Sequence, residues 1–440
     1  MSAHCRSRGT PRLLEKRPIF VALLAVLAAA SMWIYANRIL KAHQVADAAA
    51  HDRPRGNLSD LYPRWLGARE LLLHRRNPYR SDITREIQVG YYGRPIDPRR
   101  PNDPRDQQAF AYPLYIVLVL APTVGLPFVV VQKGFFWLLV ALTAASVPLW
   151  LRAVGWRPSI TGQLAWMLLA LGSFPAVQGL KLQQLTLLVA ALVAASMTAI
   201  VARHFVWGGI LLAVASIKPQ LVLLLAAWLL VWVLGKWRER RDLFWSFLIS
   251  MAVLLAASEI LLPGWIGEFR AASAAYIQYT GGGRSVLDEL LTPLWGRTVS
   301  VILVSMAFVL LWRVRSAQER TLEFQWSVAF VLATTLVVIP MSALYNQLFL
   351  LPGVMLVVQR IGRIQQQSFV SRFLLILAGI SVIWPWLAAT ALVVAALFLP
   401  AATVQRGWAM PLYTSTVTPI AIAGLLLVSR RIFVTERGPA

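Results

Sequence analysis

The sequence is poor in charged residues and almost free of cysteine. Only 14% of its 440 residues are charged, whereas 58% are hydrophobic, which is far more than the core of one water-soluble domain needs. The single cysteine, Cys5, excludes an internal disulfide and any thiol cluster. The five histidines have no ligand spacing and no Asp-x-Asp pair occurs, so we predict neither a metal site nor a cofactor.

Acidic residues are scarce, and the sequence has no nucleotide-binding fingerprint. The glycine-rich stretch at 281–284 lacks the Gly-Lys-Ser/Thr ending of a phosphate-binding loop. Nineteen acidic residues stand against 42 basic ones, which gives a net charge of +23. The basic residues are scattered between apolar runs rather than gathered on one soluble domain, so we predict topology signals and no nucleic-acid partner. Positive charge outside the bilayer would also suit anionic lipid phosphates.

Long apolar runs recur along the chain, and most can cross a bilayer core of about 30 Å. They predict an all-α polytopic membrane protein. We count twelve candidate spans, at 18–35, 129–151, 160–177, 183–202, 205–218, 220–235, 243–262, 294–312, 324–340, 345–359, 373–399 and 411–429. Basic residues then fall in alternate loops, as cytoplasmic loops require, provided that the run at 111–124 does not cross. That run is short and bounded by Pro113 and Pro122, so we expect a half-buried or re-entrant segment.

Loop charge predicts the organisation of the chain. The basic segment 1–17 indicates a cytoplasmic N-terminus, and we interpret 18–35 as a retained first span rather than a cleaved signal peptide. A long polar loop at 36–110 then faces outside. It is followed by a transmembrane core (111–262), a second outer loop (263–293), further spans (294–429) and a cytoplasmic tail (430–440). The outer turns are polar, aromatic and rich in glycine, so we expect the chemistry on that face.

The first outer loop contains a predicted amphipathic helix within residues 57–79, ended by Asn77 and Pro78, and typical of a helix on a membrane surface. Asp60 stands at its head. It suits a helix N-cap, and it also suits a general base that takes a proton from an acceptor hydroxyl. Tyr62 and Arg64 flank it. The rest of the loop, 93–108, has no periodicity, and we expect an irregular and partly mobile segment.

Lys218 ends an apolar run just before Pro219, where a lysine either extends to the interface or supplies a fixed charge for a lipid phosphate. Lys181 and Arg284 are further candidates for that phosphate. Glu259 is the one acid deep in an apolar run, and either has a function there or reaches the interface.

Aromatic and amide side chains recur in the outer turns. Tyrosine at such positions is typical of a membrane-interface belt, but aromatic faces and amides also bind sugars. The candidates for substrate binding are Tyr62, Arg64, Tyr112, Gln184, Tyr345 and Asn346.

Several short motifs in order resemble the polyprenol-phosphate-sugar-dependent membrane glycosyltransferases of family 87, the group with the mannosyltransferases of phosphatidylinositol mannoside synthesis. They are Asn77-Pro78-Tyr79 after the Asp60 helix, Tyr112-Pro113, KLQQLTLL at 181–188 and SIKPQ at 216–220. The family often has Gly-Gln-x-Asn where this chain has Gln183, Gln184, Leu185 and Thr186, so only Gln184 matches cleanly.

The resemblance implies a GT-C-like bundle of about twelve transmembrane helices and an inverting glycosyltransferase in the inner (plasma) membrane, with its active site facing outside. Asp60 would be the general base, and Lys218 would lie near the donor phosphate. The donor would be a polyprenyl-phosphate hexose or pentose, with mannose favoured, and the acceptor a lipid or glycan of the cell envelope. A lipid-linked glycan flippase or ligase and a secondary transporter are the alternatives. Acids concentrated in the first outer loop and the lack of an internal repeat favour the transferase.

Overall fold

The computed structural model describes residues 18–51, 59–97, 99–100, 102–104, 106–279, 283–340 and 343–434. These residues form helices and connecting turns, with no strand among them, so the predicted all-α class is confirmed. The expected cytoplasmic N-terminus at 1–17, including Cys5, and the end of the tail at 435–440 lie outside the described residues.

The N-terminal part begins with one long rod. α2 (Pro18–Ile34) continues through the π-helix η1 (Tyr35–Leu40) into α3 (Lys41–Ala50), well beyond the predicted end of the first span at residue 35. Four short elements follow in the first polar segment and the run after it: α4 (Leu61–His74), α5 (Ser81–Tyr92), α6 (Ile116–Leu120) and η2 (Ala121–Thr123).

The remaining chain is a bundle of helices connected by short turns. Its elements are α7 (Phe128–Ala153), α8 (Ile160–Leu171), α9 (Phe174–Leu182), α10 (Leu185–Val201), α11 (Phe205–Ala215), α12 (Pro219–Gly235), α13 (Trp237–Leu261), α14 (Trp265–Tyr279), α15 (Val286–Leu290), α16 (Pro293–Arg313), α17 (Leu322–Val338), η3 (Leu344–Leu350), α18 (Leu351–Gln365), α19 (Phe369–Phe398), α20 (Ala401–Arg406), η4 (Met410–Leu412), α21 (Val417–Val428) and α22 (Arg430–Val434).

Seven helices among the described residues are long and apolar enough to cross a membrane, or eight if the bent pair α8 and α9 forms one span. The protein is therefore a multi-pass membrane protein. All twelve predicted runs contain helix, but the count of about twelve crossings is not confirmed. Four of the apolar helices, α10, α11, α12 and α17, have only 11 to 17 residues.

A helix of 17 residues is about 25 Å long, which is short of the bilayer core. A short helix can still be apolar throughout. In α17, for example, nearly every residue is buried by other helices. A helix that is apolar on all sides fits a protein core as well as it fits lipid.

The segment at 111–124 is not among the helices that are long and apolar enough to cross a membrane. Its α-helix, α6, has five residues and is therefore only about 7.5 Å long, and Ile116, Val117 and Leu120 are buried against protein. It packs beside α4, whose predicted amphipathic pattern did produce a helix. The buried face of α4, with Leu61, Trp65 and others, is covered by α5, α6 and η2 rather than left for lipid. An amphipathic pattern predicts that one face of a helix is covered, but it does not distinguish covering by protein from covering by lipid.

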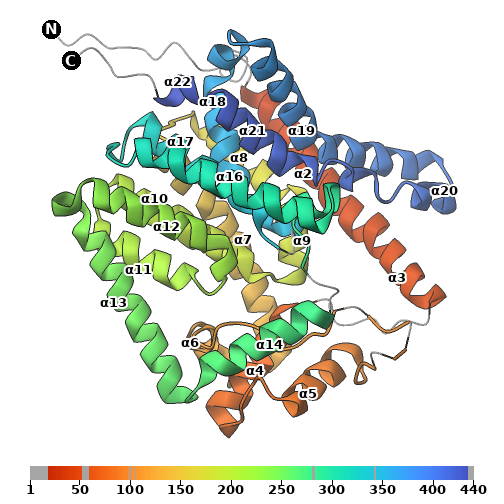
Figure 1. Ribbon diagram of the computed structural model, residues 1–440. Coiled ribbons are helices and arrows are strands. Elements are labelled where there is room, and N and C mark those ends of the chain that lie inside the picture. The colour runs from red at the N-terminus through yellow and green to blue at the C-terminus, as the bar shows by residue number, and fades with distance from the viewer. Residues whose placement is uncertain are drawn as a thin grey trace.

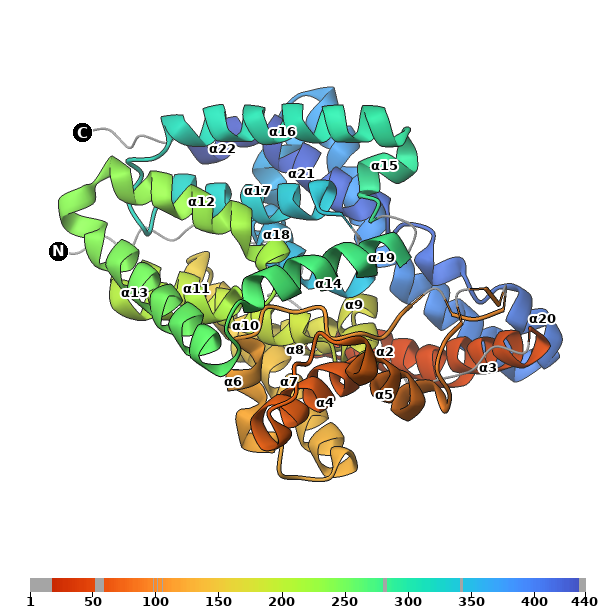
Figure 2. The same cartoon turned by 60° about the horizontal axis from the view of Figure 1, so that its bottom comes forward.

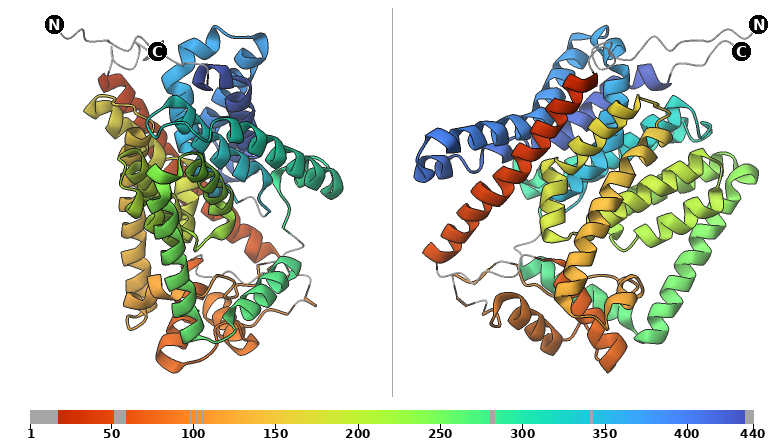
Figure 3. Two further views of the ribbon diagram at one scale, coloured as in Figure 1. Left: turned by 60° about the vertical axis from the view of Figure 1, so that its left-hand side comes forward. Right: turned by 180° about the vertical axis from the view of Figure 1, so that it is seen from behind.

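The segment at 263–293, predicted to be an outer loop, contains α14 and α15. Figures 1 and 2 show that α14 lies with α4, α5 and α6 at one end of the molecule, away from α22. The view from behind in Figure 3 shows the α2–α3 rod running along the bundle toward this end. Two hydrogen bonds connect the two polar segments, from the Tyr276 hydroxyl to Asp106 Oδ1 (3.0 Å) and from the Tyr279 hydroxyl to the Pro104 carbonyl (3.1 Å). The irregular segment is thus held against a helix distant in sequence.

Candidate active site

A cavity of about 340 Å³ lies where α4, α10, α12, α14 and η3 come together. Two carboxylates, two cations, aromatic rings and amides line it. Seven of the ten candidate site residues are in its wall, namely Asp60, Arg64, Tyr112, Gln184, Lys218, Tyr345 and Asn346. Residues far apart in the sequence therefore share one polar, aromatic enclosure.

Asp60 stands directly before the first residue of α4, but its side chain makes no capping hydrogen bond. Its carboxylate instead accepts a hydrogen bond from Gln184 Nε2, and its backbone N–H donates to the Leu182 carbonyl at 2.8 Å. The Arg64 guanidinium donates to the Asp60 carbonyl one helical turn away. The acid is thus fixed from both sides and faces the cavity.

Gln184 connects this acid to a cation. Lys218 Nζ donates to Gln184 Oε1 at 3.0 Å and to the Thr186 hydroxyl at 2.7 Å. The Thr186 hydroxyl in turn donates to Asn346 Oδ1 at 3.1 Å. The amide of Gln184 therefore has its N–H on the carboxylate and its oxygen on the ammonium, an orientation that both charges reinforce.

Local sequence explains how these side chains reach the cavity. Gln183 has a left-handed backbone (φ 51°) that ends α9, and Gln184 is extended, which turns the chain into α10. Lys218 precedes α12, where Pro219 in the first turn loses no hydrogen bond because the first N–H groups of a helix have no partner. Lys218 is only 5% exposed, so it does not extend to a solvent interface.

The charges in the cavity influence one another. Burial is the largest effect on Asp60 and raises the pKa of this carboxyl above its usual value, and the charge of Asp106 acts in the same direction. Arg64, Lys218 and the Gln184 hydrogen bond lower it, but not enough to cancel the rise. Such a carboxyl is a better proton acceptor than an ordinary aspartate.

Aromatic rings complete the wall around the cations. The Arg64 guanidinium lies 4.6 Å from the centre of the Tyr112 ring, and Lys218 Nζ lies 5.0 Å from the centre of the Tyr345 ring. Both are within the range of cation–π attraction. Arg64 Nε has no hydrogen-bond partner among the described residues, so a donor remains for a ligand.

Three candidate residues lie elsewhere. Tyr62 packs on Trp65 and Phe128, Lys181 lines a different cavity, and Arg284 is exposed and lines neither cavity. Glu259 is also outside, where its carboxylate accepts the Gly264 N–H at 2.7 Å and closes the turn after α13.

The comparisons with known proteins agree with a membrane enzyme. The sequence model of glycosyltransferase family 87 matches residues 110–340, more than half of the 440 residues. The chain belongs to glycosyltransferase family 87. A search of curated proteins and a search of solved structures found no significant match. Family 87 membership makes this protein a membrane glycosyltransferase.

The family 87 match covers only part of the cavity wall. It includes Tyr112, Gln184 and Lys218, but it begins after Asp60 and ends before Tyr345. The structure therefore shows that Asp60 and the η3 turn, which lie outside the matched region, line the same cavity.

Asp106 is a wall residue of this glycosyltransferase that the sequence analysis missed. Its carboxylate accepts hydrogen bonds from the Tyr276 hydroxyl and from Gln108 Nε2 (2.6 Å). Burial raises the pKa of Tyr276, so this hydroxyl stays protonated and can donate. Asp106 lies in the aperiodic segment, where nothing distinguishes one aspartate from its neighbours. A pattern search cannot find it, because its position depends on α14.

The described residues contain no group of three or more histidine, cysteine, aspartate or glutamate side chains that could hold a metal ion.

Proposed function

We propose that this family 87 enzyme transfers a hexose or pentose, mannose being favoured, from a polyprenyl-phosphate-sugar donor to a lipid or glycan acceptor of the cell envelope. Asp60 acts as the general base and the reaction inverts the anomeric centre. The loop charges favour a plasma (inner) membrane enzyme whose cavity faces outside.

In the proposed reaction, an acceptor hydroxyl attacks the anomeric carbon of the donor sugar while Asp60 takes the hydroxyl proton. The new carbon–oxygen bond forms as the bond from the anomeric carbon to the phosphate oxygen breaks. The electron pair of that bond leaves with the polyprenyl phosphate. Lys218 and Arg64 stabilise its negative charge, and a phosphate leaving group needs no second acid.

The Gln184 bridge is the observation that supports this proposal most strongly. It holds the Asp60 carboxylate and the Lys218 ammonium on opposite ends of one side-chain amide, both at the cavity wall. A sugar bound between these two groups would have a proton acceptor for the attacking hydroxyl on one side and a cation for the leaving phosphate on the other. The rings of Tyr112 and Tyr345 and the amide of Asn346 offer the faces and polar groups that sugars bind.

The proposal is tested by sugar transfer with the purified protein in nanodiscs, using polyprenyl-phosphate sugars beside nucleotide sugars as donors and Asp60→Asn as the variant. We expect transfer from a lipid-phosphate donor, reduced about 10²- to 10⁴-fold in the variant, which is the usual contribution of a general base. Asp82→Asn is the matched control, because Asp82 is an exposed acid of α5 that pairs with Arg76 away from the cavity.

Formation of a glycosidic bond, shown by mass spectrometry of the product, separates a transferase from a flippase or transporter, which would move the donor unchanged. Asp60→Asn protein that keeps wild-type transfer would refute the assignment of the base and direct attention to Asp106.

A further inference from the structure

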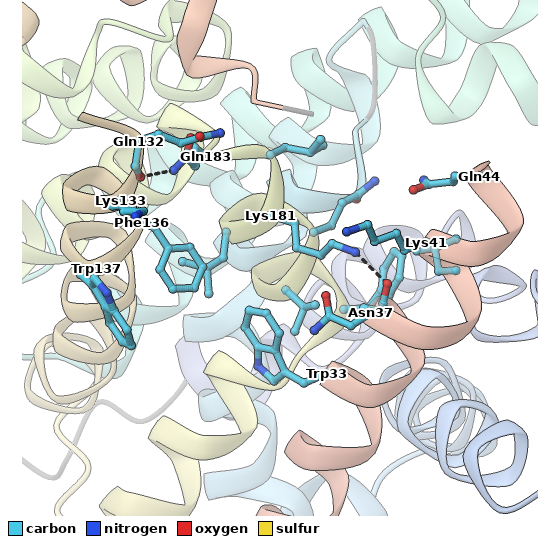
Figure 4. A pocket seen from close by; sticks show the side chains of 17 residues that line it. Trp33, Asn37, Lys41, Gln44, Gln132, Lys133, Phe136, Trp137, Lys181 and Gln183 are labelled. Atoms are coloured by element: carbon cyan, nitrogen blue, oxygen red, sulfur yellow. Dashed lines mark hydrogen bonds between the residues drawn. The ribbon is translucent and has the colours of Figure 1, made fainter. Parts of the chain in front are cut away.

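A second and larger cavity, of about 580 Å³, lies between the α2–α3 rod, the first turns of α7 and helix α9. Figure 4 shows its side chains. Three lysines from three separate elements line it, Lys41 from α3, Lys133 from α7 and Lys181 from α9, and Figure 4 shows Lys41 and Lys181 on one side of the cavity and Lys133 on the α7 side. None of the lining residues is acidic. Neither Lys41 nor Lys133 forms an ion pair with a carboxylate of the described residues.

The backbone beside Lys41 and Lys181 forms the π-helix η1 instead of a regular α-helix. In the π-helix η1, the Ala36 carbonyl accepts the backbone N–H of Lys41, five residues later, and it also accepts Lys181 Nζ at 2.7 Å. Figure 4 shows this contact and the neighbouring Asn37 side chain. Single π turns within α-helices often occur at functional sites. Here the turn lies where the rod, the lysines and the cavity meet.

The other wall is aromatic and leads to the outside of the bundle. Phe136 and Trp137 come from α7 and Trp33 from α2, two of the helices long enough to cross the membrane. Phe136 makes edge contacts with both tryptophans, at 6.5 Å from Trp33 and 5.3 Å from Trp137 between ring centres. Trp137 is 68% exposed. A wall that carries lysines and an aromatic wall that opens on helices long enough to cross the membrane together match an amphiphile with an anionic head.

We propose that this second cavity binds the phosphate-bearing head group of an anionic lipid, with its hydrocarbon chain along Trp33, Phe136 and Trp137 into the bilayer. Lys41, Lys133 and Lys181 line the same cavity, and their combined positive charge attracts the phosphate. The site is separate from the sugar-transfer cavity, and binding there needs no catalysis.

The two cavities are adjacent. Gln183 lines the second cavity and Gln184 lines the first, and each is bonded to one of two consecutive residues, Ser59 and Asp60. The two cavities are therefore lined by consecutive residues of the same turn, Gln183 and Gln184.

Native mass spectrometry of the intact protein tests this proposal, with lipids added to detergent-solubilised, delipidated protein. The probes are dioleoyl phosphatidylglycerol, undecaprenyl phosphate and, as a zwitterionic reference, dioleoyl phosphatidylcholine. The variant is the double substitution Lys41→Gln and Lys133→Gln, whose exposed side chains carry little risk for folding. Lys236→Gln is the matched control, since this lysine lines neither cavity.

We expect wild-type and control protein to bind an anionic lipid in preference to phosphatidylcholine, and the double variant to bind it roughly fivefold more weakly for each lysine removed. Loss of only undecaprenyl phosphate binding would identify the carrier lipid as the occupant, and loss of only phosphatidylglycerol binding would identify a phospholipid. Equal binding of every anionic lipid by the double variant and the wild type would overturn the proposal. Because Asp60→Asn should bind lipid normally, a failure here is distinguishable from a failure of the transfer mechanism.

Discussion

Replacing Gln184 by leucine tests the bridge on which the proposed mechanism depends. The side chain is 3% exposed, and leucine fills nearly the same volume, so the change removes two hydrogen bonds without opening a large cavity. Both lost bonds involve a charged group, one the Asp60 carboxylate and the other the Lys218 ammonium. The substitution therefore acts on the charges rather than on packing.

The magnitude follows from the strength of such bonds. A hydrogen bond to a charged group contributes about 1.5–3 kcal/mol, so losing one that matters in the transition state lowers kcat/KM by roughly 10- to 150-fold. The Gln184 hydrogen bond also lowers the pKa of Asp60. Its removal should raise that pKa further and move the acidic limb of the rate profile to higher pH, because the base works only as the carboxylate.

The assay is the initial rate of sugar transfer against pH for wild type, Gln184→Leu and Gln183→Leu. Gln183 is the matched control because it occupies the same turn and bonds Ser59 and the Gln132 carbonyl, but not Asp60. Only Gln184→Leu should move the acidic limb. A limb unchanged in Gln184→Leu, or moved equally in both variants, would refute the role of the bridge. A limb moved to lower pH would mean that Asp60 and Lys218 pair directly once the amide is gone.

Two further predictions concern pH and packing. Because burial raises the pKa of Asp60, kcat/KM of the wild type should fall with decreasing pH through a pKa above 3.8, and a limb at or below that value would contradict the assignment. The same shift means that the fold favours the neutral acid, a stabilisation present at low pH and lost as pH rises through the folded-state pKa. Asp60→Asn should therefore not lower Tm at pH 7. Gly209→Ala should destabilise the protein by about 1–3 kcal/mol, since the new methyl group would lie 2.6 Å from the Leu243 carbonyl of α13. Gly134→Ala, with nothing within 4 Å, should not lower Tm in the same thermal melt, because alanine also favours the helix over glycine, and equal Tm values for both variants would contradict this packing.

Local pattern was sufficient for the helices of the apolar runs and for α4, but not for α14 and α15, which lie in a segment predicted as a loop. The apolar runs predicted the positions of helical segments, and the periodicity after Asp60 predicted α4, because both depend on side chains a few residues apart. The number of crossings could not be obtained in this way. α17 is as apolar as a transmembrane span, yet protein covers it on all sides. Hydropathy shows that a segment avoids water, but it does not distinguish burial in protein from burial in lipid.

The site shows the same division between local and tertiary information. Residue types and positions in the turns that were predicted to face outside identified Asp60, Gln184 and Lys218 as candidates, but the first two are 124 residues apart and only the fold joins them. Lys181 and Gln184 are three residues apart and were assigned to one site, yet they line different cavities because the left-handed turn at Gln183 redirects the chain. Asp106 is held in the cavity wall by a hydrogen bond from Tyr276 of α14, which local sequence cannot indicate.

The sequence by itself determined that this protein is helical and membrane-bound and that its polar chemistry lies in a few turns, since composition and periodicity are properties of neighbouring residues. Only the tertiary structure decided which helices face one another, which acid meets which cation, and that the lysines divide between two cavities. Those contacts depend on the directions in which the chain turns between helices, and the free energy that fixes these directions comes from packing between residues distant in the sequence.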